Sequence, residues 1–319
     1  MKNTFLISLL FGILNLNAQT IFVSLHGNDS SEGTEQHPVA TLAKARQLAA
    51  QYPSDTSVEV ILEDGVYYLP ETLVFTPEDS KAYPYQVTYR AKHEGKAVIS
   101  GGLQLKLKWK KDKKGIWSAI IGEDIQIDQL YVDGERKRMA RYPNAIPGEG
   151  RNVYDTWVLN HSATSSEMQD VLHPERIARW SNPEGGYVHA MHHALWGDMH
   201  WLIKGKASDG TLDMEGGWQN NRPSSMHEVY RMVENIEEEL DVPGEWFYDK
   251  QARRLYYYPE SDEDMNQASI EVVRLGNLIE VQGEQSNPVV GLRFQGLVFR
   301  HSNRTFMENK EQLEKQKMK

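Results

Sequence analysis

A series of short, β-branched segments joined by turns, with no helix between them, constrains the fold of this chain more than any other feature. The segments occupy residues 58–62, 72–75, 86–91 and 97–100. Turn signals such as Asp64-Gly65 separate them. This pattern is typical of an all-β solenoid, in which each turn of the chain adds short strands to parallel sheets.

The same pattern returns after an interruption. Short strand-like segments, again punctuated by glycine and proline, occupy residues 270–273, 278–281, 290–294 and 297–300. We therefore predict one solenoid that is split by an inserted domain, with Ile99 and Ile270 in neighbouring layers. At least about three repeats of a solenoid must stack to bury a continuous core.

The stretch between the two halves has a different pattern. Leu105, Leu107 and Trp109 alternate with lysines, which gives a strand with one apolar face. Polar turns at residues 111–115 and 249–254 lie between strand-like segments and predict hairpins. The middle stretch is therefore predicted to be antiparallel sheet.

The first residues have the order of a secretory signal peptide, with a positive start at Lys2, an apolar run over residues 5–14 and a small residue at Ala18. A bilayer span needs roughly 20 apolar residues, so the run is too short to cross a membrane. The alternative is a buried N-terminal helix, but no amphipathic period supports it. We expect the mature chain to be secreted or periplasmic.

Composition excludes several classes of function. The net charge of −10 over 319 residues offers no positive field to a phosphate backbone, so no nucleic-acid partner is expected. Cysteine is absent, which excludes disulfides, thiolate metal sites and a cysteine nucleophile. No later stretch is long and apolar enough for a membrane span.

The length suggests about two domains, and the patterns divide the chain into five parts. These are a signal peptide at 1–18, an N-terminal cap and first solenoid coils at 19–102, an inserted antiparallel domain at 103–264, resumed coils at 265–306 and a polar tail at 307–319. Within the cap, Thr41 begins a predicted helix over residues 41–51. The polar tail is no solenoid cap, so we expect a fragment from the N-terminal part of a longer protein. A frayed helix at a true terminus is the alternative.

Several motifs resemble those of a known family. Phe22-Val23-Ser24, Gly27-Asn28-Asp29-Ser30 and Asp64-Gly65-Val66-Tyr67 are similar to the opening of secreted right-handed parallel β-helix proteins. Leu130-Tyr131-Val132-Asp133-Gly134 and Pro243-Gly244-Glu245-Trp246 resemble the inserted domain of the carbohydrate-active members, which include glycoside hydrolases of xylosidase and fucosidase type. The resemblance implies an all-β fold, a right-handed parallel β-helix interrupted by an inserted antiparallel β-sandwich-like domain. It also implies catalytic carboxylates on later coils, so no catalytic residue is carried over.

The densest polar and aromatic stretch covers residues 188–201. His192, His193, Trp196 and Trp201 are its candidate substrate-binding residues, because ligand pockets combine aromatic faces with a few polar groups. Metal binding by the histidines and ordinary core packing are the alternatives. The stretch lacks the His-Glu-x-x-His motif of zinc proteases, and adjacent histidines on a strand point to opposite faces.

Three other stretches have both a functional and a structural interpretation. Oxygen-bearing residues at 28–32 would suit Ca²⁺, the one cofactor considered, although such turns also form for backbone reasons. The lysines between 106 and 114 could bind an acidic glycan or protect a hairpin edge. The acidic run at 234–241 is interpreted as a solvated face rather than a catalytic pair.

The sequence therefore predicts an exported carbohydrate-active protein, with a glycoside hydrolase acting on plant or other complex polysaccharides as the leading hypothesis. The expected partner is a polysaccharide or oligosaccharide. Hydrolysis needs paired carboxylates, and we expect no turnover of aryl glycosides by this chain. The alternatives are a polysaccharide lyase on the same scaffold, with a Lys or Arg base and often Ca²⁺, and a non-catalytic glycan-binding or structural β-helix protein.

Overall fold

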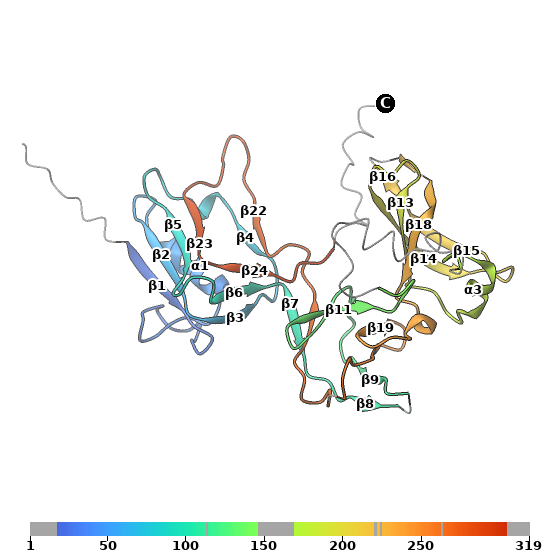
Figure 1. Ribbon diagram of the computed structural model, residues 1–319. Coiled ribbons are helices and arrows are strands. Elements are labelled where there is room, and N and C mark those ends of the chain that lie inside the picture. The colour runs from blue at the N-terminus through green and yellow to red at the C-terminus, as the bar shows by residue number, and fades with distance from the viewer. Residues whose placement is uncertain are drawn as a thin grey trace, which may run out of the picture. The chain divides into compact units, whose positions relative to one another are not determined.

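The computed structural model describes residues 18–112, 114–145, 169–219, 222–223, 225–262 and 264–304. The predicted polar tail and all of the predicted signal peptide except Ala18 lie outside the described residues. The chain divides into two compact units (Figure 1). The first unit comprises residues 1–101 and 277–300, and the second unit comprises residues 102–276 and 301–319. Within the described ranges, no helix has the length and apolar character needed to cross a membrane.

Parallel strands form three sheets in the first unit. Their orders are β1–β2–β5–β23, β3–β6–β24 and β4–β22, and every pairing is parallel. The strands are β1 (Gln19–Val23), β2 (Val58–Leu62), β3 (Gly65–Tyr68), β4 (Leu73–Phe75), β5 (Val87–Ala91), β6 (Ala97–Ser100), β22 (Ile279–Val281), β23 (Leu292–Gln295) and β24 (Val298–Arg300). The last three follow the second unit in sequence and still pair with strands that precede it.

Side chains at matching positions of these parallel strands stack inside the first unit. Tyr89 in β5 and Phe294 in β23 are register partners, and their rings stack with centroids 5.6 Å apart. Phe75 in β4 meets both rings edge-on, at 5.3 and 5.8 Å. Aromatic pairs of this kind contribute about 0.5–1.5 kcal/mol beyond the area that they bury.

The predicted helix near the N-terminus is confirmed. Helix α1 (Leu42–Gln51) begins after Thr41, whose side chain accepts a hydrogen bond from the Lys44 N–H. A 3-10 turn, η1 (Pro77–Asp79), follows β4. The chain is therefore mostly β rather than all-β.

The second unit contains two larger sheets. One has the order β7–β21–β10–β11–β19–β20–β9–β8, and the other is antiparallel with the order β12–β18–β13–β14–β15. In the eight-stranded sheet β11 and β19 run parallel, so the prediction of a purely antiparallel domain is wrong at that pair. The hairpins predicted around residues 111–115 and 249–254 are confirmed as β8–β9 and β19–β20.

The eight-stranded sheet consists of β7 (Gly102–Leu105), β8 (Lys110–Lys111), β9 (Trp117–Ile120), β10 (Leu130–Val132), β11 (Glu135–Met139), β19 (Glu245–Asp249), β20 (Arg254–Tyr257) and β21 (Ile270–Val273). The five-stranded sheet consists of β12 (Arg141–Tyr142), β13 (Tyr187–His192), β14 (Asp198–Lys206), β15 (Leu212–Gly216) and β18 (Met226–Glu234). The described part of the unit also contains helix α3 (Pro174–Arg179), the 3-10 turn η2 (Glu237–Glu239) and the short pair β16 (Trp218–Gln219) and β17 (Arg222–Pro223).

The strand that contains Ile270 exists, but its neighbours differ from the prediction. β21 lies between β7 and β10 and is antiparallel to both. Ile99 lies instead in β6 of the first unit, so the expected neighbouring layers of Ile99 and Ile270 are wrong. The local pattern of a short strand does not specify its partner, and Ile270 packs with Leu130 and Val132 in the core of the eight-stranded sheet.

The chain passes twice between the two sheets of the second unit. It leaves β11 for β12 after Met139, and it leaves β18 for β19 after Glu234. At these crossings Arg138 is the register partner of Glu245, and Arg141 is the register partner of Glu234. Paired residues project from the same face of a sheet, so the crossings bring four charged side chains together.

Candidate functional site

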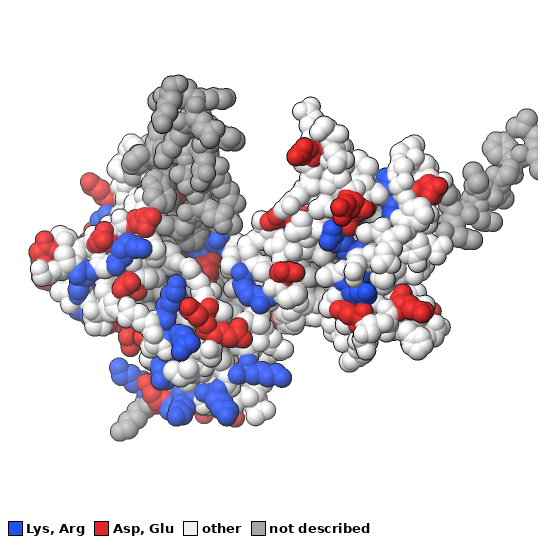
Figure 2. Space-filling model, turned by 180° about the vertical axis from the view of Figure 1, so that it is seen from behind, with Lys and Arg blue, Asp and Glu red and all other residues white. Residues whose placement is uncertain are grey.

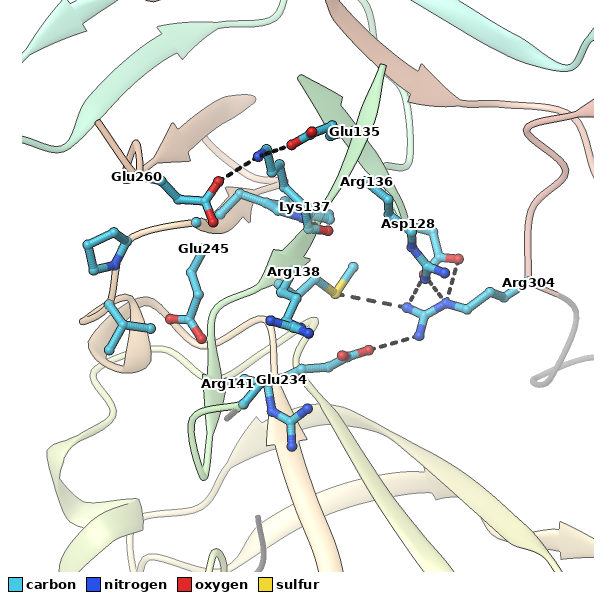
Figure 3. A pocket seen from close by; sticks show the side chains of 16 residues that line it. Asp128, Glu135, Arg136, Lys137, Arg138, Arg141, Glu234, Glu245, Glu260 and Arg304 are labelled. Carbon is cyan, nitrogen blue, oxygen red and sulfur yellow. Dashed lines mark hydrogen bonds and ion pairs between the residues drawn. The ribbon is translucent and has the colours of Figure 1, made fainter. Parts of the chain in front are cut away.

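A cavity of about 730 Å³ lies at these two crossings (Figure 3). Its size is within the range of small-molecule sites, roughly 300–1,000 Å³. Charged side chains dominate the lining. They are Asp128, Glu135, Arg136, Lys137, Arg138, Arg141, Glu234, Glu245, Glu260 and Arg304.

On one side of the cavity Lys137 is paired with two carboxylates. Its Nζ lies 3.1 Å from a carboxylate oxygen of Glu135 and 2.7 Å from one of Glu260. Burial would lower the pKa of Lys137, but the hydrogen bonds to Glu260 and Glu135 outweigh it and hold that pKa above its usual range. These three side chains leave no positive charge free for a ligand.

Glu234 lies in a second group of paired charges. Its Oε1 is 2.6 Å from His189 Nε2 and 3.0 Å from Arg304 Nη1, and Arg304 also binds Asp128. Burial would raise the pKa of Glu234, but the charges and hydrogen bonds of His189 and Arg304 hold that pKa well below its usual range. Behind this group, burial and the charge of His189 lower the pKa of His200 to about 3. Glu234 is therefore an ionised carboxylate held by its partners.

Glu245 is the opposite case. It is only 2% exposed, and neither carboxyl oxygen has a side-chain hydrogen-bond partner among the described residues. Burial raises the pKa of Glu245 to about 8, with a further contribution from the charge of Asp241, while the Arg141 guanidinium acts in the other direction. At neutral pH Glu245 is therefore mostly protonated, and it can donate a proton or a hydrogen bond into the cavity.

Three arginines line the cavity without a carboxylate partner. Arg136 and Arg138 are exposed, and their side chains make no hydrogen bond or ion pair within the described ranges. Arg141 is 9% exposed; its Nε donates to the Pro143 carbonyl at 2.8 Å, and its Nη2 has no partner among the residues described. Figure 3 shows Arg138 and Glu245 reaching into the same part of the cavity. Buried polar groups without partners are rare in folded proteins and require an explanation.

The structure brings together three of the four predicted substrate-binding residues. The His192 ring at the end of β13 lies 4.2 Å from the His193 ring and stacks on Trp196 at 5.2 Å, with the planes only 5° apart. Trp196 is 77% exposed. We call His192, His193 and Trp196 the Trp196 platform. Trp201 does not join it, because it is buried in the core of the five-stranded sheet.

The residues considered for calcium have structural partners. Asp29 Oδ1 accepts hydrogen bonds from the backbone N–H groups of Ala40 and Thr41, and Oδ2 accepts one from the Thr41 hydroxyl. These bonds tie the loop to the start of helix α1. In the part of the chain that the structure describes, no three His, Asp or Glu side chains are grouped as metal ligands.

The interpretation of residues 234–241 as a solvated acidic face is wrong for two of its members. Glu234 is buried at the cavity, and Glu239 is buried against Arg176 and Trp180. Arg176 Nη1 binds both Glu239 oxygens at 2.7 and 2.8 Å, and Trp180 Nε1 donates to one of them at 2.8 Å. A run of acidic letters does not reveal these partners, which lie far away in the sequence.

Basic side chains gather at the lower end of the second unit in Figure 2, the end where Figure 1 shows the β8–β9 hairpin. Lys106, Lys108 and Lys110 are exposed along the segment that leads into this hairpin, and Lys111 lies 2.5 Å from Asp262. Lysines on a hairpin edge fit edge protection at least as well as glycan binding.

Comparison with known proteins shows the fold alone. No protein-family model and no curated protein matches the sequence. A solved structure described as a glycoside hydrolase matches with a TM-score of 0.70 and 23% identity, over 90% of this chain and 51% of that one. A second, described as the complex of XylC with xylose, matches with a TM-score of 0.38 and 12% identity, over 89% of this chain and 35% of that one, and carries no argument at that similarity. The chain thus spans about half the length of a glycoside hydrolase whose fold it resembles.

The sequence contained one overlooked signal for the cavity. Residues 135–141 (ERKRMAR) are dense in arginine, and alternation along β11 places Arg136 and Arg138 on one face. Glu245 had no such signal, because its unusual state comes from burial and from neighbours on other strands.

Proposed function

We propose that this chain is an exported carbohydrate-active protein with the architecture of a glycoside hydrolase. The observation that carries the proposal is the fold likeness to a glycoside hydrolase over 90% of the chain. A cavity of suitable size and an exposed tryptophan, both in the second unit, are consistent with sugar binding.

We also propose that the three parallel sheets are the sides of a right-handed parallel β-helix. Along the chain, β2, β3 and β4 enter the three sheets in turn, and β5 and β6 enter the first two again. After the second unit, β22 enters the third sheet, and β23 and β24 enter the first and second. The second unit therefore interrupts the cycle where the third sheet is due, which supports an insertion between two coils.

The Trp196 platform is the first proposed sugar contact. A flat ring that is 77% exposed and held parallel to His192 offers an apolar face to a pyranose. Trp201 has no such exposed face, so we propose that it stabilises the five-stranded sheet by core packing and does not contact the sugar.

The test is direct binding of sugars to the full chain. Isothermal titration with a panel of neutral and acidic monosaccharides and short oligosaccharides should detect binding of at least one class. Trp196→Ala should weaken it about three- to tenfold, the range expected for an aromatic contact, while the exposed aromatic control Tyr83→Ala leaves it unchanged. Absence of binding to every sugar would contradict the proposal. Aryl glycosides tested alongside should remain intact, and their turnover would show that this chain carries its own catalytic carboxylates.

A further inference from the structure

We propose that the cavity at the crossings of the second unit binds the carboxylate of an acidic sugar, a uronic acid residue, between Arg138 and Arg141. This inference rests on the proposed function and assigns a substrate class to the cavity.

The pairing of charges in the cavity leaves guanidinium groups for an anionic ligand. Lys137 is paired with two carboxylates, Glu135 and Glu260, and Arg304 is paired with two others, Asp128 and Glu234. The remaining charged groups are Arg136, Arg138 and Arg141 against the single carboxyl of Glu245. None of these three guanidinium groups has an ion-pair partner among the described residues, and with Glu245 protonated the lining carries five positive and four negative charges.

The positions of these groups indicate a built site rather than a basic surface. Arg141 is more than nine-tenths buried, and its Nη2 has no partner among the described residues. Burial is the main cause that lowers the pKa of Arg141; the carboxylates of Glu234 and Glu245 act in the other direction, and the charge of Arg138 adds a smaller lowering. Two like charges held together at a cavity wall are stabilised when an anion is placed between them.

Glu245 completes the site as a hydrogen-bond donor. A protonated carboxyl can donate to the ligand oxygens, and β11–β19 pairing places it beside Arg138. The charged groups around it are Arg138 on β11, Arg141 on β12 and Asp241 after η2. Ionisation of Glu245 would neutralise one guanidinium and repel the bound anion, so binding should weaken above about pH 8.

A carboxylate fits better than a neutral hydroxyl. The guanidinium group presents a planar pair of N–H donors that matches the two oxygens of a carboxylate. A neutral sugar would leave both arginines without a counter-charge and would lose the charge-assisted hydrogen bonds. We therefore expect a preference for a uronic acid over its neutral parent sugar.

The experiment is isothermal titration of the full chain with glucuronate, galacturonate and their neutral parents, glucose and galactose. At least one uronate should bind tenfold or more tightly than its parent at pH 6.5. The exposed Arg138→Gln should reduce uronate affinity by roughly tenfold or more, with less than about a twofold effect on the parent. Arg179→Gln, an exposed arginine at the end of helix α3 that does not line the cavity, is the charge-matched control.

The pH dependence of uronate affinity distinguishes a site that uses protonated Glu245 from simple attraction of an anion by the arginines. Uronate affinity should fall as the pH rises from 6.5 to 9, and Glu245→Gln should remove most of that fall. A flat profile in the unaltered chain would overturn the role of Glu245.

The remaining outcomes distinguish the two proposals. If neutral sugars bind as tightly as uronates, or if Arg138→Gln has no selective effect, the acidic-sugar site is wrong while the carbohydrate function stands. If inorganic sulfate and acetate compete as well as the uronate binds, the cavity is a general anion site and the assignment fails. If no sugar binds, the proposed function itself fails.

Discussion

Two buried ionisable side chains, one in each unit, differ in the partners that they have. In the first unit, Lys81 is 2% exposed, and its Nζ donates to the carbonyls of Ala49 and Tyr52 at 3.2 and 2.6 Å. In the second unit, Glu245 is equally buried but has no side-chain partner among the described residues. A buried charge that is hydrogen-bonded to the backbone stabilises the fold. A buried polar group that faces a cavity without such a partner is available to a ligand.

The largest expected effect concerns the apolar core of the first unit. Phe75→Ala should destabilise the protein by about 3–5 kcal/mol, because Phe75 is completely buried against Tyr89 and Phe294. Urea unfolding followed by far-ultraviolet circular dichroism measures the loss, because the first unit contains no tryptophan. The exposed Val290→Ala is the control. A cost below about 1 kcal/mol would show that the aromatic stack does not hold the parallel sheets together.

The next effect tests the paired carboxylate of the second unit. Glu239→Gln should cost about 3 kcal/mol, because it leaves the buried Arg176 guanidinium without its counter-charge. The same exchange at Glu245 is the matched control, since that carboxyl has no ion-pair partner among the described residues. The measurement is urea unfolding at pH 7. Equal losses of unfolding free energy at the two positions would contradict the distinction between a carboxylate that is ion-paired in the fold and one that is not.

Glu245 should also make stability depend on pH. Its pKa of about 8 in the folded protein exceeds its ordinary value of 4.5, so the folded state keeps a proton that the unfolded chain releases. The resulting stabilisation is complete below about pH 4.5 and is lost as the pH rises through 8, at up to about 1.4 kcal/mol per pH unit. The unfolding free energy should be measured from pH 5 to 9 for the unaltered chain and for Glu245→Gln. It should fall more steeply with pH in the unaltered chain, by the slope given above. Parallel profiles would contradict the raised pKa.

The smallest effect concerns the loop considered for calcium. Asp29→Ala should cost about 1–3 kcal/mol, because the carboxylate accepts bonds from the backbone at Ala40 and Thr41. Thermal unfolding with and without millimolar Ca²⁺ should give the same midpoint. A clear rise with Ca²⁺ that Asp29→Ala abolishes would show instead that the loop is a metal site.

Much of the fold followed from local patterns, and the candidate site did not. The short strands, the Thr41 cap and both hairpins were predictable because each depends on neighbouring residues. The partners of Ile270 were not, because strand pairing is decided by contacts far along the chain. The state of Glu245 was equally hidden, because it depends first on burial, which only the folded sheets provide, and then on the charges of Asp241 and Arg141.

The crystal structure of the full chain with a bound uronate tests the central claim most directly. The account predicts the sugar in the cavity of the second unit, with its carboxylate within hydrogen-bond distance of the Arg138 and Arg141 guanidinium groups and of the Glu245 carboxyl. A uronate bound elsewhere, with Arg141 Nη2 and both Glu245 oxygens still without partners, would contradict it.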